Sequence, residues 1–374
     1  MSDKKRALIA MSGGVDSSVA VHLMQKSGYD CVGATMRLYE AQVVHCERKE
    51  NSDDSIFANE KREDAVCGSN SAVQEAQAVA EHFNIPFRAY DYRDDFKEEV
   101  ICRFINTYIE GGTPNPCVEC NRHMKFGRLM DKMREEGCDY VVTGHYVRVE
   151  YDEAYGQYVL KKGRDENKDQ SYVLYNLTKE QLAHCKFPLG EYSKDEIREM
   201  AETLGLLNAR KKDSQDICFV PDGDYASFIE DYTGKSFEEG NFVSRDGKVL
   251  GRHKGMIRYT IGQRKGLGLA LQEPMYVYEK RMDTNEVVLC RNEELFSSVL
   301  EAVDVNWIVE PKEGQTIHCK AKARYKQKEA EAQVECLGDD KVRVTFTEPQ
   351  RGITAGQSVV FYDEDVVLGG GKIL

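Results

Sequence analysis

The sequence predicts an α/β protein in which an N-terminal doubly wound parallel sheet is followed by a small central domain and a C-terminal antiparallel β-barrel. Short β-rich runs alternate with helical runs up to about residue 212, and this alternation is typical of a parallel sheet covered by helices on both faces. After Asp213 glycines become frequent and long helices rare. From Tyr278 onward, short alternating runs separated by turn residues indicate a small barrel or sandwich.

These changes of pattern divide the chain into three predicted domains, at 1–212, 213–277 and 278–374. A chain of 374 residues is long enough for several cores, because single cores stop growing at about 250–300 residues. Apolar runs alternate with polar ones along the N-terminal domain. Its expected strands are 6–12, 31–39, 85–92 and 138–147, and its expected helices are 17–28, 71–84 and 122–137.

Composition excludes membrane-spanning and disordered proteins. Hydrophobic residues make up 41% of the chain, and no uninterrupted apolar run approaches the length of a membrane span. The apolar stretch near the N-terminus is too short for a signal peptide. We therefore expect a cytoplasmic protein that has no membrane partner. We also expect a monomer. The polar insertion at 41–64, which contains Cys46, is expected to be a mobile surface excursion, and we assign it no function.

Twelve cysteines without a secretory signal are better explained as thiols or ligands than as a disulfide framework. Most of them stand singly in apolar or mixed surroundings, where we expect small buried side chains. This group contains Cys31, Cys102, Cys138, Cys185, Cys290, Cys319 and Cys336.

A glycine corner in "MSGGVDSS", residues 11–18, predicts an anion site. Ser12, Gly13 and Gly14 end a strand, and a helix begins at Asp16. Glycine lets the backbone approach a ligand closely, while the N–H groups and the dipole at a helix start attract negative charge. The corner lacks the Gly-Lys-Ser/Thr of a Walker A loop and the spacing of a dinucleotide fingerprint. It therefore indicates a different kind of phosphate site.

A pair of cysteines follows in "TPNPCVECNRHMKFG", residues 113–127. Two prolines restrict the backbone around Asn115, and Asn121 is expected to cap a new helix. Cys117 and Cys120 would then lie on a rigid loop at a helix N-terminus, where the thiolate is stabilised. A third thiol, Cys218, lies in "KDSQDICF" among polar residues. These three thiols are predicted to be reactive.

The glycine corner resembles the SGGxDS loop of the PP-loop ATP pyrophosphatases, whose N-terminal domain is adenine nucleotide α-hydrolase-like. This resemblance implies ATP and Mg²⁺ as cofactors. Asp16 is implied to be a catalytic residue that faces the metal, because hard cations prefer carboxylate oxygen. Met36 is implied to contact adenine, although an apolar residue at a strand end could equally belong to the core. The implied ATP site contains Ala10, Met11, Ser12, Gly13, Gly14, Val15, Asp16, Ser17, Ser18, Met36 and Gly144.

The loop together with the cysteine motifs closely resembles the tRNA-specific 2-thiouridylase family. The likeness continues in the family's order through "GHY" at 144–146, "KDQSYVLY" at 168–175, "YTIGQRKGLG" at 259–268 and "PQRGITAGQSVVFYD" at 349–363. It implies that ATP adenylates the C2 oxygen of the wobble uridine of certain tRNAs. A persulfide on Cys218 then supplies sulfur, and the nucleophile Cys120 assists its release and ends in a disulfide with Cys218. A cysteine desulfurase or sulfur-relay protein is the implied donor.

One position departs from the family pattern. Many members have Asp where this chain has Cys117, and the triplet Asn115, Pro116 and Cys117 is implied to contact the target base. Cys117, Cys120 and Cys218 could alternatively hold three irons of a [4Fe–4S] cluster. The persulfide route and the cluster route both remain open at this point.

Binding of tRNA is predicted from charge and from the family resemblance. The formal net charge is −13, yet acid-free basic runs occur at 248–272 and 318–328. Such runs suit contacts with phosphate. His145 ends a buried strand, so a structural role and an RNA contact are both open. The implied tRNA contacts are His145, Lys168, Asp169, Gln170, Arg324, Tyr325 and Gln357.

Two other functions are compatible with parts of this pattern. Another adenylating PP-loop enzyme, such as an amide-forming or lysidine-type ligase, would use the glycine corner without the thiols. A non-catalytic tRNA-binding or sulfur-carrier protein would need neither ATP turnover nor base chemistry.

Overall fold

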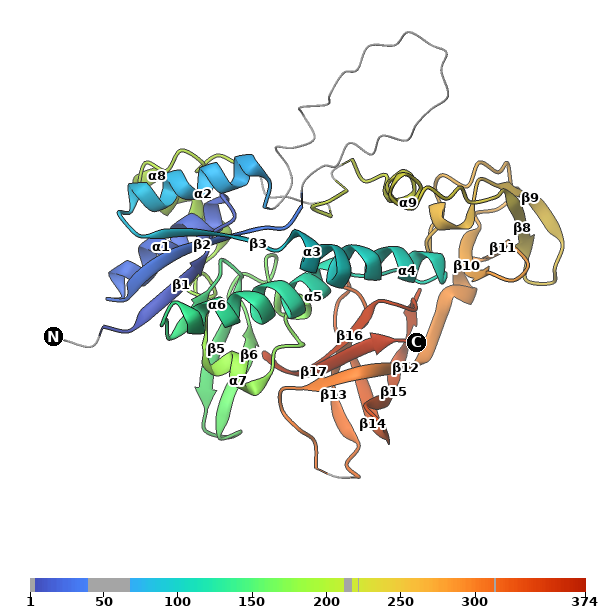
Figure 1. Cartoon of the computed structure of the whole chain (residues 1–374). Coiled ribbons are helices and arrows are strands. Elements are labelled where there is room, and N and C mark those ends of the chain that lie inside the picture. Colours follow the sequence, from blue (N-terminus) through green and yellow to red (C-terminus); the bar gives the residue numbers. More distant parts are fainter. Residues whose placement is uncertain (1–3, 40–67, 212–216, 221, 313) are drawn as a thin grey trace, which may run out of the picture.

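The computed structural model describes residues 4–39, 68–211, 217–220, 222–312 and 314–374 (Figure 1). The insertion at 41–64 and residues 212–216, which begin the motif "KDSQDICF", lie outside the described residues. Within them, no helix combines the length and the apolar character that crossing a membrane requires.

A five-stranded parallel sheet forms the N-terminal domain, as the βαβ alternation predicts. The strand order is β3-β2-β1-β4-β7, and each neighbouring pair is parallel. β1 alternates between the two faces, with Ala7 and Ile9 in one core and Leu8 in the other. The strands are β1 (Arg6–Ala10), β2 (Asp30–Arg37), β3 (Phe87–Asp91), β4 (Tyr140–Val142) and β7 (Cys185–Lys186).

Helices cover both faces of this sheet, so the doubly wound class is confirmed (Figure 1). One face packs against α1 (Val15–Lys26), α2 (Asn70–His82) and α8 (Lys194–Thr203). The other face packs against two longer helical segments that each contain a π-helical stretch. These are α3 (Arg93–Phe96) with η2 (Lys97–Cys102) and α4 (Arg103–Ile109), and α5 (Pro116–Glu119) with η3 (Cys120–Arg128) and α6 (Leu129–Glu135).

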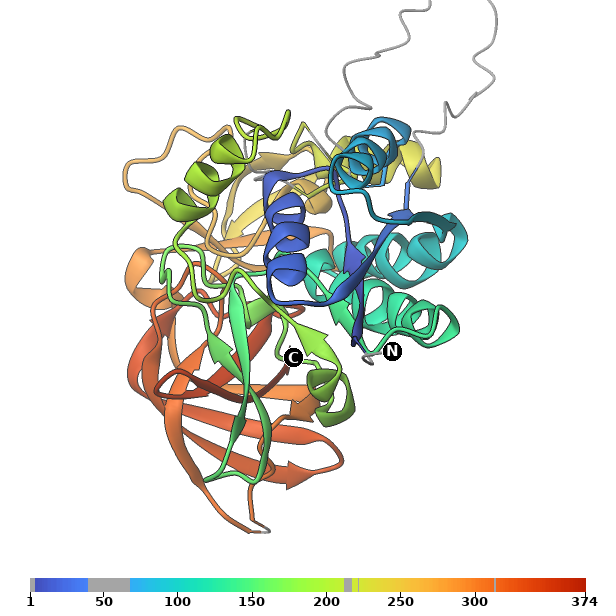
Figure 2. The same ribbon diagram turned by 90° about the vertical axis from the view of Figure 1, so that its left-hand side faces the viewer.

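The C-terminal strands form a closed antiparallel barrel, as predicted, because β12 pairs with both β15 and β17. The barrel strands are β12 (Phe296–Trp307), β13 (Ile317–Lys322), β14 (Ala330–Gly338), β15 (Lys341–Arg351), β16 (Ser358–Asp363) and β17 (Val366–Ile373). A hairpin of the N-terminal domain, β5 (Val147–Asp152) with β6 (Gln157–Lys162), extends this sheet through Lys161 and Val366. Figure 2 shows the hairpin in green beside the barrel.

The central domain is a small sheet of order β10-β11-β8-β9. The predicted boundary between residues 277 and 278 falls inside β10, whose pairing with β11 keeps that strand in the central sheet. Its elements are α9 (Tyr225–Thr233), β8 (Gly240–Ser244), β9 (Val249–His253), η5 (Met256–Arg258), β10 (Tyr276–Arg281), β11 (Glu286–Cys290) and η6 (Asn292–Leu295). The short η4 (Ser171–Val173) and α7 (Lys179–Ala183) connect the hairpin β5–β6 to β7.

Most of the cysteines expected to be small core residues are buried, namely Cys31, Cys138, Cys185, Cys290 and Cys319. Cys102 is half-buried. The expectation is wrong for Cys336, which is exposed. Its strand β14 alternates between a buried and an exposed face, and toward its end every residue is exposed.

Candidate active site

The glycine corner joins β1 to α1 in a turn that leaves no room for a side chain at Gly13. Gly13 has φ of +72°, and a Cβ there would lie 2.7 Å from Glu75 Oε2. Gly14 is the N-cap of α1, and its carbonyl accepts hydrogen bonds from the Ser17 and Ser18 hydroxyls at 3.0 and 2.9 Å. The first N–H groups of a helix have no partner within the helix. The turn therefore presents a helix N-terminus suited to an anion.

Asp16 is held by two side chains that the sequence reasoning missed. Lys194 Nζ lies 2.8 Å from Asp16 Oδ1 and 2.9 Å from Oδ2. The Tyr146 hydroxyl donates to Asp16 Oδ1 at 2.7 Å. Lys194 is only 4% exposed, so its charge is balanced inside the protein by this carboxylate. A cation and a carboxylate thus stand together at the start of α1, where charged phosphates and a hard cation could bind.

Lys194 has a sequence signal that could have revealed it. It occupies the first position of α8, directly after the capping residue Ser193. A cation there opposes the helix dipole, which favours acidic side chains in the first turn. A lysine at the first position of a helix is therefore the sequence signal, because it indicates a role outside its own helix.

Asn208 is a further contact that the sequence did not indicate. Its Nδ2 donates to the Gly13 carbonyl and to Ser18 Oγ, both at 2.9 Å. These two bonds tie the segment after α8 to the glycine turn and stabilise its shape.

Gly144 lies against the same turn from the end of β4. A Cβ on Gly144 would be 2.9 Å from the carbonyl carbon of Asp16 and 3.0 Å from its Cβ. Gly144 therefore packs directly against the glycine corner, and its role toward ATP stays a prediction. Met36 is 9% exposed and belongs to the core on one face of the sheet. Its packing favours the core role that the sequence left open.

We expect Gly144→Ala to lower the free energy of unfolding by about 1–3 kcal/mol, because the added methyl group overpacks against the backbone of Asp16. Urea unfolding measures the loss. Gly14→Ala is the matched control, since its Cβ would meet Ser12 Oγ at an ordinary 3.4 Å and its φ is −88°. Equal stability of the two variants would contradict the steric argument.

The two cysteines of the CxxC pair lie inside the first turns of a helix rather than on a loop. α5 begins at Pro116, whose fixed φ suits the first helical position, and continues directly into η3. The expected cap at Asn121 is therefore wrong. Asn121 is buried within the helix, and its Nδ2 donates to the Val173 carbonyl at 3.0 Å. Cys117 is exposed and Cys120 is half-buried.

Cys218 packs against the same hydrophobic core as Cys120, although nearly a hundred residues separate them. Its neighbour Phe219 makes edge-on contacts with Phe96 and Phe104, at centroid distances of 5.8 and 5.2 Å. Those two rings belong to the helical segment that runs beside α5. The tertiary structure thus brings the Cys218 segment to the helices beside the CxxC pair.

The positions of the cysteines do not support the hypothesis of a [4Fe–4S] cluster. Among the residues that the structure describes, no three His, Cys, Asp or Glu side chains gather closely enough to hold a metal ion. We therefore derive no step through an iron–sulfur cluster. A magnesium ion bound with ATP does fit the corner, because the Asp16 carboxylate is 31% exposed beside the helix start.

Predicted tRNA contacts from two domains lie together near Cys117. The Tyr325 hydroxyl donates to the Asp169 carbonyl at 3.2 Å. Tyr325 is 38% exposed, and its partial burial raises the pKa of its hydroxyl, which the nearby charges of Asp169 and Cys117 raise further. Lys322 Nζ lies 5.7 Å from the centre of the Tyr325 ring. The barrel and the N-terminal domain therefore build one surface beside the cysteine helix.

Several predicted tRNA contacts also make hydrogen bonds within the protein. Gln357 Nε2 donates to the carbonyls of Thr113 and Pro114, at 2.8 and 3.2 Å. The Asp169 carboxylate accepts from the Ser171 hydroxyl at 2.7 Å. Two more are engaged in the same way: Gln170 accepts from the Tyr146 N–H at 3.0 Å, and Arg324 donates to Thr354 Oγ1 at 2.7 Å and to the Gly352 carbonyl. Lys168 is half-buried. These bonds shape the surface from within.

Family models and relatives among known proteins match this chain over nearly its full length. Residues 5–222 match the family model "tRNA methyl transferase HUP domain", 226–291 the "tRNA methyl transferase PRC-barrel domain" and 297–373 the "Aminomethyltransferase beta-barrel domain". The tRNA-specific 2-thiouridylase MnmA of Clostridioides difficile is 47% identical over 99% of this chain and 98% of its own length. The MnmA proteins of Clostridium kluyveri and Acetivibrio thermocellus are each 45% identical over 99% of both chains.

The chain belongs to the tRNA-specific 2-thiouridylase family. This membership confirms the resemblance drawn from the glycine corner and the cysteine motifs. Cys117 therefore differs from the Asp of many family members, although this chain matches a 2-thiouridylase over nearly its full length.

His145 is almost fully enclosed in the 2-thiouridylase fold, at 7% exposure. Its Nδ1 is 2.6 Å from Thr143 Oγ1, and its Nε2 is 3.4 Å from Lys125 Nζ. Because the lysine ammonium can only donate, Nε2 accepts and Nδ1 carries the proton. Burial lowers the pKa of His145 well below its usual value, and the Lys125 charge lowers it further. These contacts favour the structural role of the two that the sequence left open.

Acid should destabilise the protein through His145. Its pKa is lowered in the folded state, so the unfolded chain binds the extra proton first. The stabilisation is present above about pH 6.5 and is lost as the pH falls below that value, by at most about 1.4 kcal/mol per pH unit. Urea unfolding between pH 7 and 5 measures the slope. His145→Gln should flatten it, while His82→Gln, at the exposed end of α2, should keep the slope of the unaltered protein.

Proposed function

We propose that this chain catalyses ATP-dependent 2-thiolation of the wobble uridine of tRNA, with release of AMP and pyrophosphate, as a monomer in the cytoplasm. The observation that carries the proposal is the packing of Cys120 and Cys218 against one core, in a chain that belongs to the tRNA-specific 2-thiouridylase family. An amide-forming or lysidine-type ligase would have no use for these thiols.

The glycine corner binds the phosphates of ATP in this proposal. The N–H groups at the start of α1 contact the pyrophosphate, and Gly13 and Gly144 permit its close approach. Lys194, which is now paired with Asp16, turns toward the phosphates, while Asp16 holds Mg²⁺. When bound, the metal neutralises charge on the departing pyrophosphate. Ala10, Met11, Ser12, Val15, Ser17 and Ser18 complete the turn.

Adenylation converts the C2 oxygen of uridine into a leaving group. The terminal sulfur of a Cys218 persulfide then attacks C2, and AMP departs with the former oxygen. The Cys120 thiolate attacks the Cys218 sulfur, breaks its bond to the transferred sulfur and leaves that sulfur on the base. A Cys120–Cys218 disulfide remains, and a dithiol reductant reopens it. A cysteine desulfurase or sulfur-relay protein restores the persulfide.

The target base enters beside Asn115, Pro116 and Cys117, at the start of α5. A wobble base must leave the anticodon stack to be modified, which costs a few kcal/mol. Exposed Tyr325, next to Cys117, lies where an aromatic ring can receive an unstacked base. His145, Lys168, Asp169, Gln170, Arg324 and Gln357 shape the surrounding tRNA surface.

Mass spectrometry of tRNA nucleosides tests the proposal. The protein is incubated with unmodified tRNA, ATP, Mg²⁺, a cysteine desulfurase with cysteine, and a dithiol, and 2-thiouridine is counted against the AMP formed. One 2-thiouridine per AMP is expected. AMP formation with nitrogen on the base would indicate a ligase, and tRNA binding without AMP would indicate a non-catalytic protein.

A further inference from the structure

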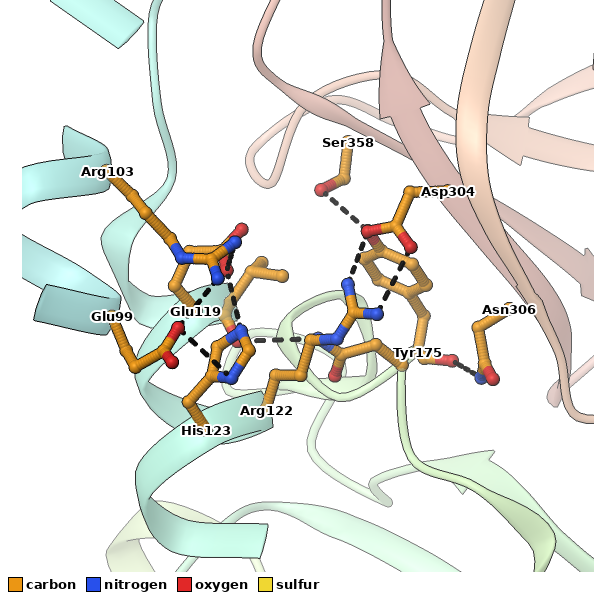
Figure 3. Close-up of polar contacts among 11 residues, drawn as sticks. Glu99, Arg103, Glu119, Arg122, His123, Tyr175, Asp304, Asn306 and Ser358 are labelled. Atoms are coloured by element: carbon orange, nitrogen blue, oxygen red, sulfur yellow. Dashed lines mark hydrogen bonds and ion pairs between the residues drawn. The ribbon is translucent and has the colours of Figure 1, made fainter. Parts of the chain in front are cut away.

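A bulge in barrel strand β12 reaches across to the helix that carries the two cysteines. The pairing of β12 with β17 shifts register between Val303 and Asn306. Within that bulge Asp304 has φ of +50°, a left-handed backbone that few residues other than glycine, Asn and Asp adopt readily. Bulges of this kind redirect side chains. Here the redirected side chains leave the barrel and face the N-terminal domain (Figure 3).

Asp304 contacts the cysteine helix directly. Its carboxylate takes two hydrogen bonds from the Arg122 guanidinium, one of them at 3.1 Å. Arg122 lies two residues after Cys120 on the same helix. A bidentate pair between a guanidinium and a carboxylate fixes the relative orientation of the two groups as well as the distance between them. The hydrogen bond with Asp304 also raises the pKa of Arg122.

Asn306 contacts the same helix through an intermediate segment. Its Nδ2 donates to the carbonyls of Tyr175 and Leu177, at 2.8 and 3.1 Å. Between those residues, Asn176 Nδ2 donates to the Val118 carbonyl at 3.4 Å, inside the turn that joins Cys117 to Cys120. The bulge thus contacts the cysteine helix directly through Asp304 and Arg122, and indirectly through Asn306 and the segment at 175–177 (Figure 3).

We propose that Asp304 and Asn306 are positioning residues for sulfur transfer: the β12 bulge sets where Cys120 stands relative to a base held on the barrel side. This inference rests on the proposed function. Both partners of the Arg122–Asp304 pair are substantially exposed, and exposed pairs contribute little to stability. We therefore expect the Arg122–Asp304 pair to matter for the orientation of the cysteine helix, because a small misplacement of a reacting group slows a reaction strongly.

Asp304→Asn tests the direct route, because Asn tolerates the left-handed backbone but lacks the charge. We expect the single-turnover rate of 2-thiouridine formation to fall about tenfold, while the Kd for tRNA and the KM for ATP stay within about twofold. Arg122→Gln should have a similar effect, and the double variant should lose no more than either single one, because the two residues act through each other. Glu301→Gln is the matched control: Glu301 lies on the same strand but pairs with Lys341 and Arg343 of the barrel.

A second measurement does not depend on activity. The rate at which iodoacetamide alkylates Cys120, followed by peptide mass spectrometry, should change in Asp304→Asn and Asn306→Asp but not in Glu301→Gln. Unchanged alkylation and thiolation in Asp304→Asn would overturn the inference, and so would weaker tRNA binding at an unchanged saturated rate or additive losses in the double variant. Absence of 2-thiouridine with the unaltered protein would instead refute the proposed function, and the alkylation rates would still decide the positioning role.

Discussion

Cys218→Ser should lower the formation of 2-thiouridine by about 10³-fold or more, because a hydroxyl cannot carry a persulfide and is a poor nucleophile at neutral pH. Cys120→Ser should cause a loss of similar size for a different reason. In that variant the persulfide still forms on Cys218, but the thiol proposed to release the transferred sulfur is missing. Nucleoside mass spectrometry measures the product, and peptide mass spectrometry of Cys218 after treatment with a cysteine desulfurase separates the two cases.

Cys102→Ser provides the matched control for these substitutions. Cys102 is half-buried at the end of η2, on the helical segment that runs beside α5, and it has no role in the proposed chemistry. Its replacement should leave 2-thiouridine formation within about twofold of the unaltered protein. If Cys120→Ser and Cys218→Ser behaved like this control, the sulfur-transfer mechanism would be refuted even though family membership would stand.

Asp16→Asn should reduce tRNA-dependent formation of AMP by about 10²–10³-fold, because the carboxylate proposed to hold Mg²⁺ is lost. The same change should destabilise the fold, since Lys194 is left buried without its charged partner. Losing one member of a buried pair costs about 3–5 kcal/mol. Asp16 is about one third exposed, so we expect about 2 kcal/mol.

A double variant separates these two effects. Adding Lys194→Met to Asp16→Asn removes the buried charge and should restore most of the stability, while AMP formation stays low. Lys211→Met, which breaks the more exposed pair with Glu75 near the same turn, is the control and should cost less than about 1 kcal/mol. Recovery of AMP formation in the double variant would show that Asp16 acts only as a partner for Lys194.

The positioning role of the β12 bulge and the sulfur chemistry make different demands on the same helix. The proposed mechanism requires Cys120 to be a thiol for any product to form, whereas the proposed role of Asp304 and Asn306 is to set where that thiol lies. The expected losses therefore differ by about two orders of magnitude. A variant of the bulge that abolished product completely would indicate loss of the fold rather than misplacement.

Local patterns were enough to predict the fold class and the chemistry-bearing motifs. The continuous apolar run of β1 specifies a strand buried on both faces, and Gly13 and Gly14 indicate a tight turn, with positive φ at Gly13. The same reasoning failed at Asn121, where a good capping residue lies inside a helix that had already begun at Pro116. A buried bond to Val173 outweighs the capping preference of Asn121.

By itself, the sequence determined the parallel sheet, the barrel, the glycine corner and the cysteine motifs, because each depends on residues close together in the chain. The tertiary structure alone decided that Lys194 pairs with Asp16, that Cys218 and Cys120 pack against one core, and that Asp304 reaches Arg122. Sequence spacing carries no information on such contacts, because they depend on how strands and helices far apart in the chain pack in three dimensions. The chemistry can therefore be predicted from motifs, whereas its alignment depends on packing between domains.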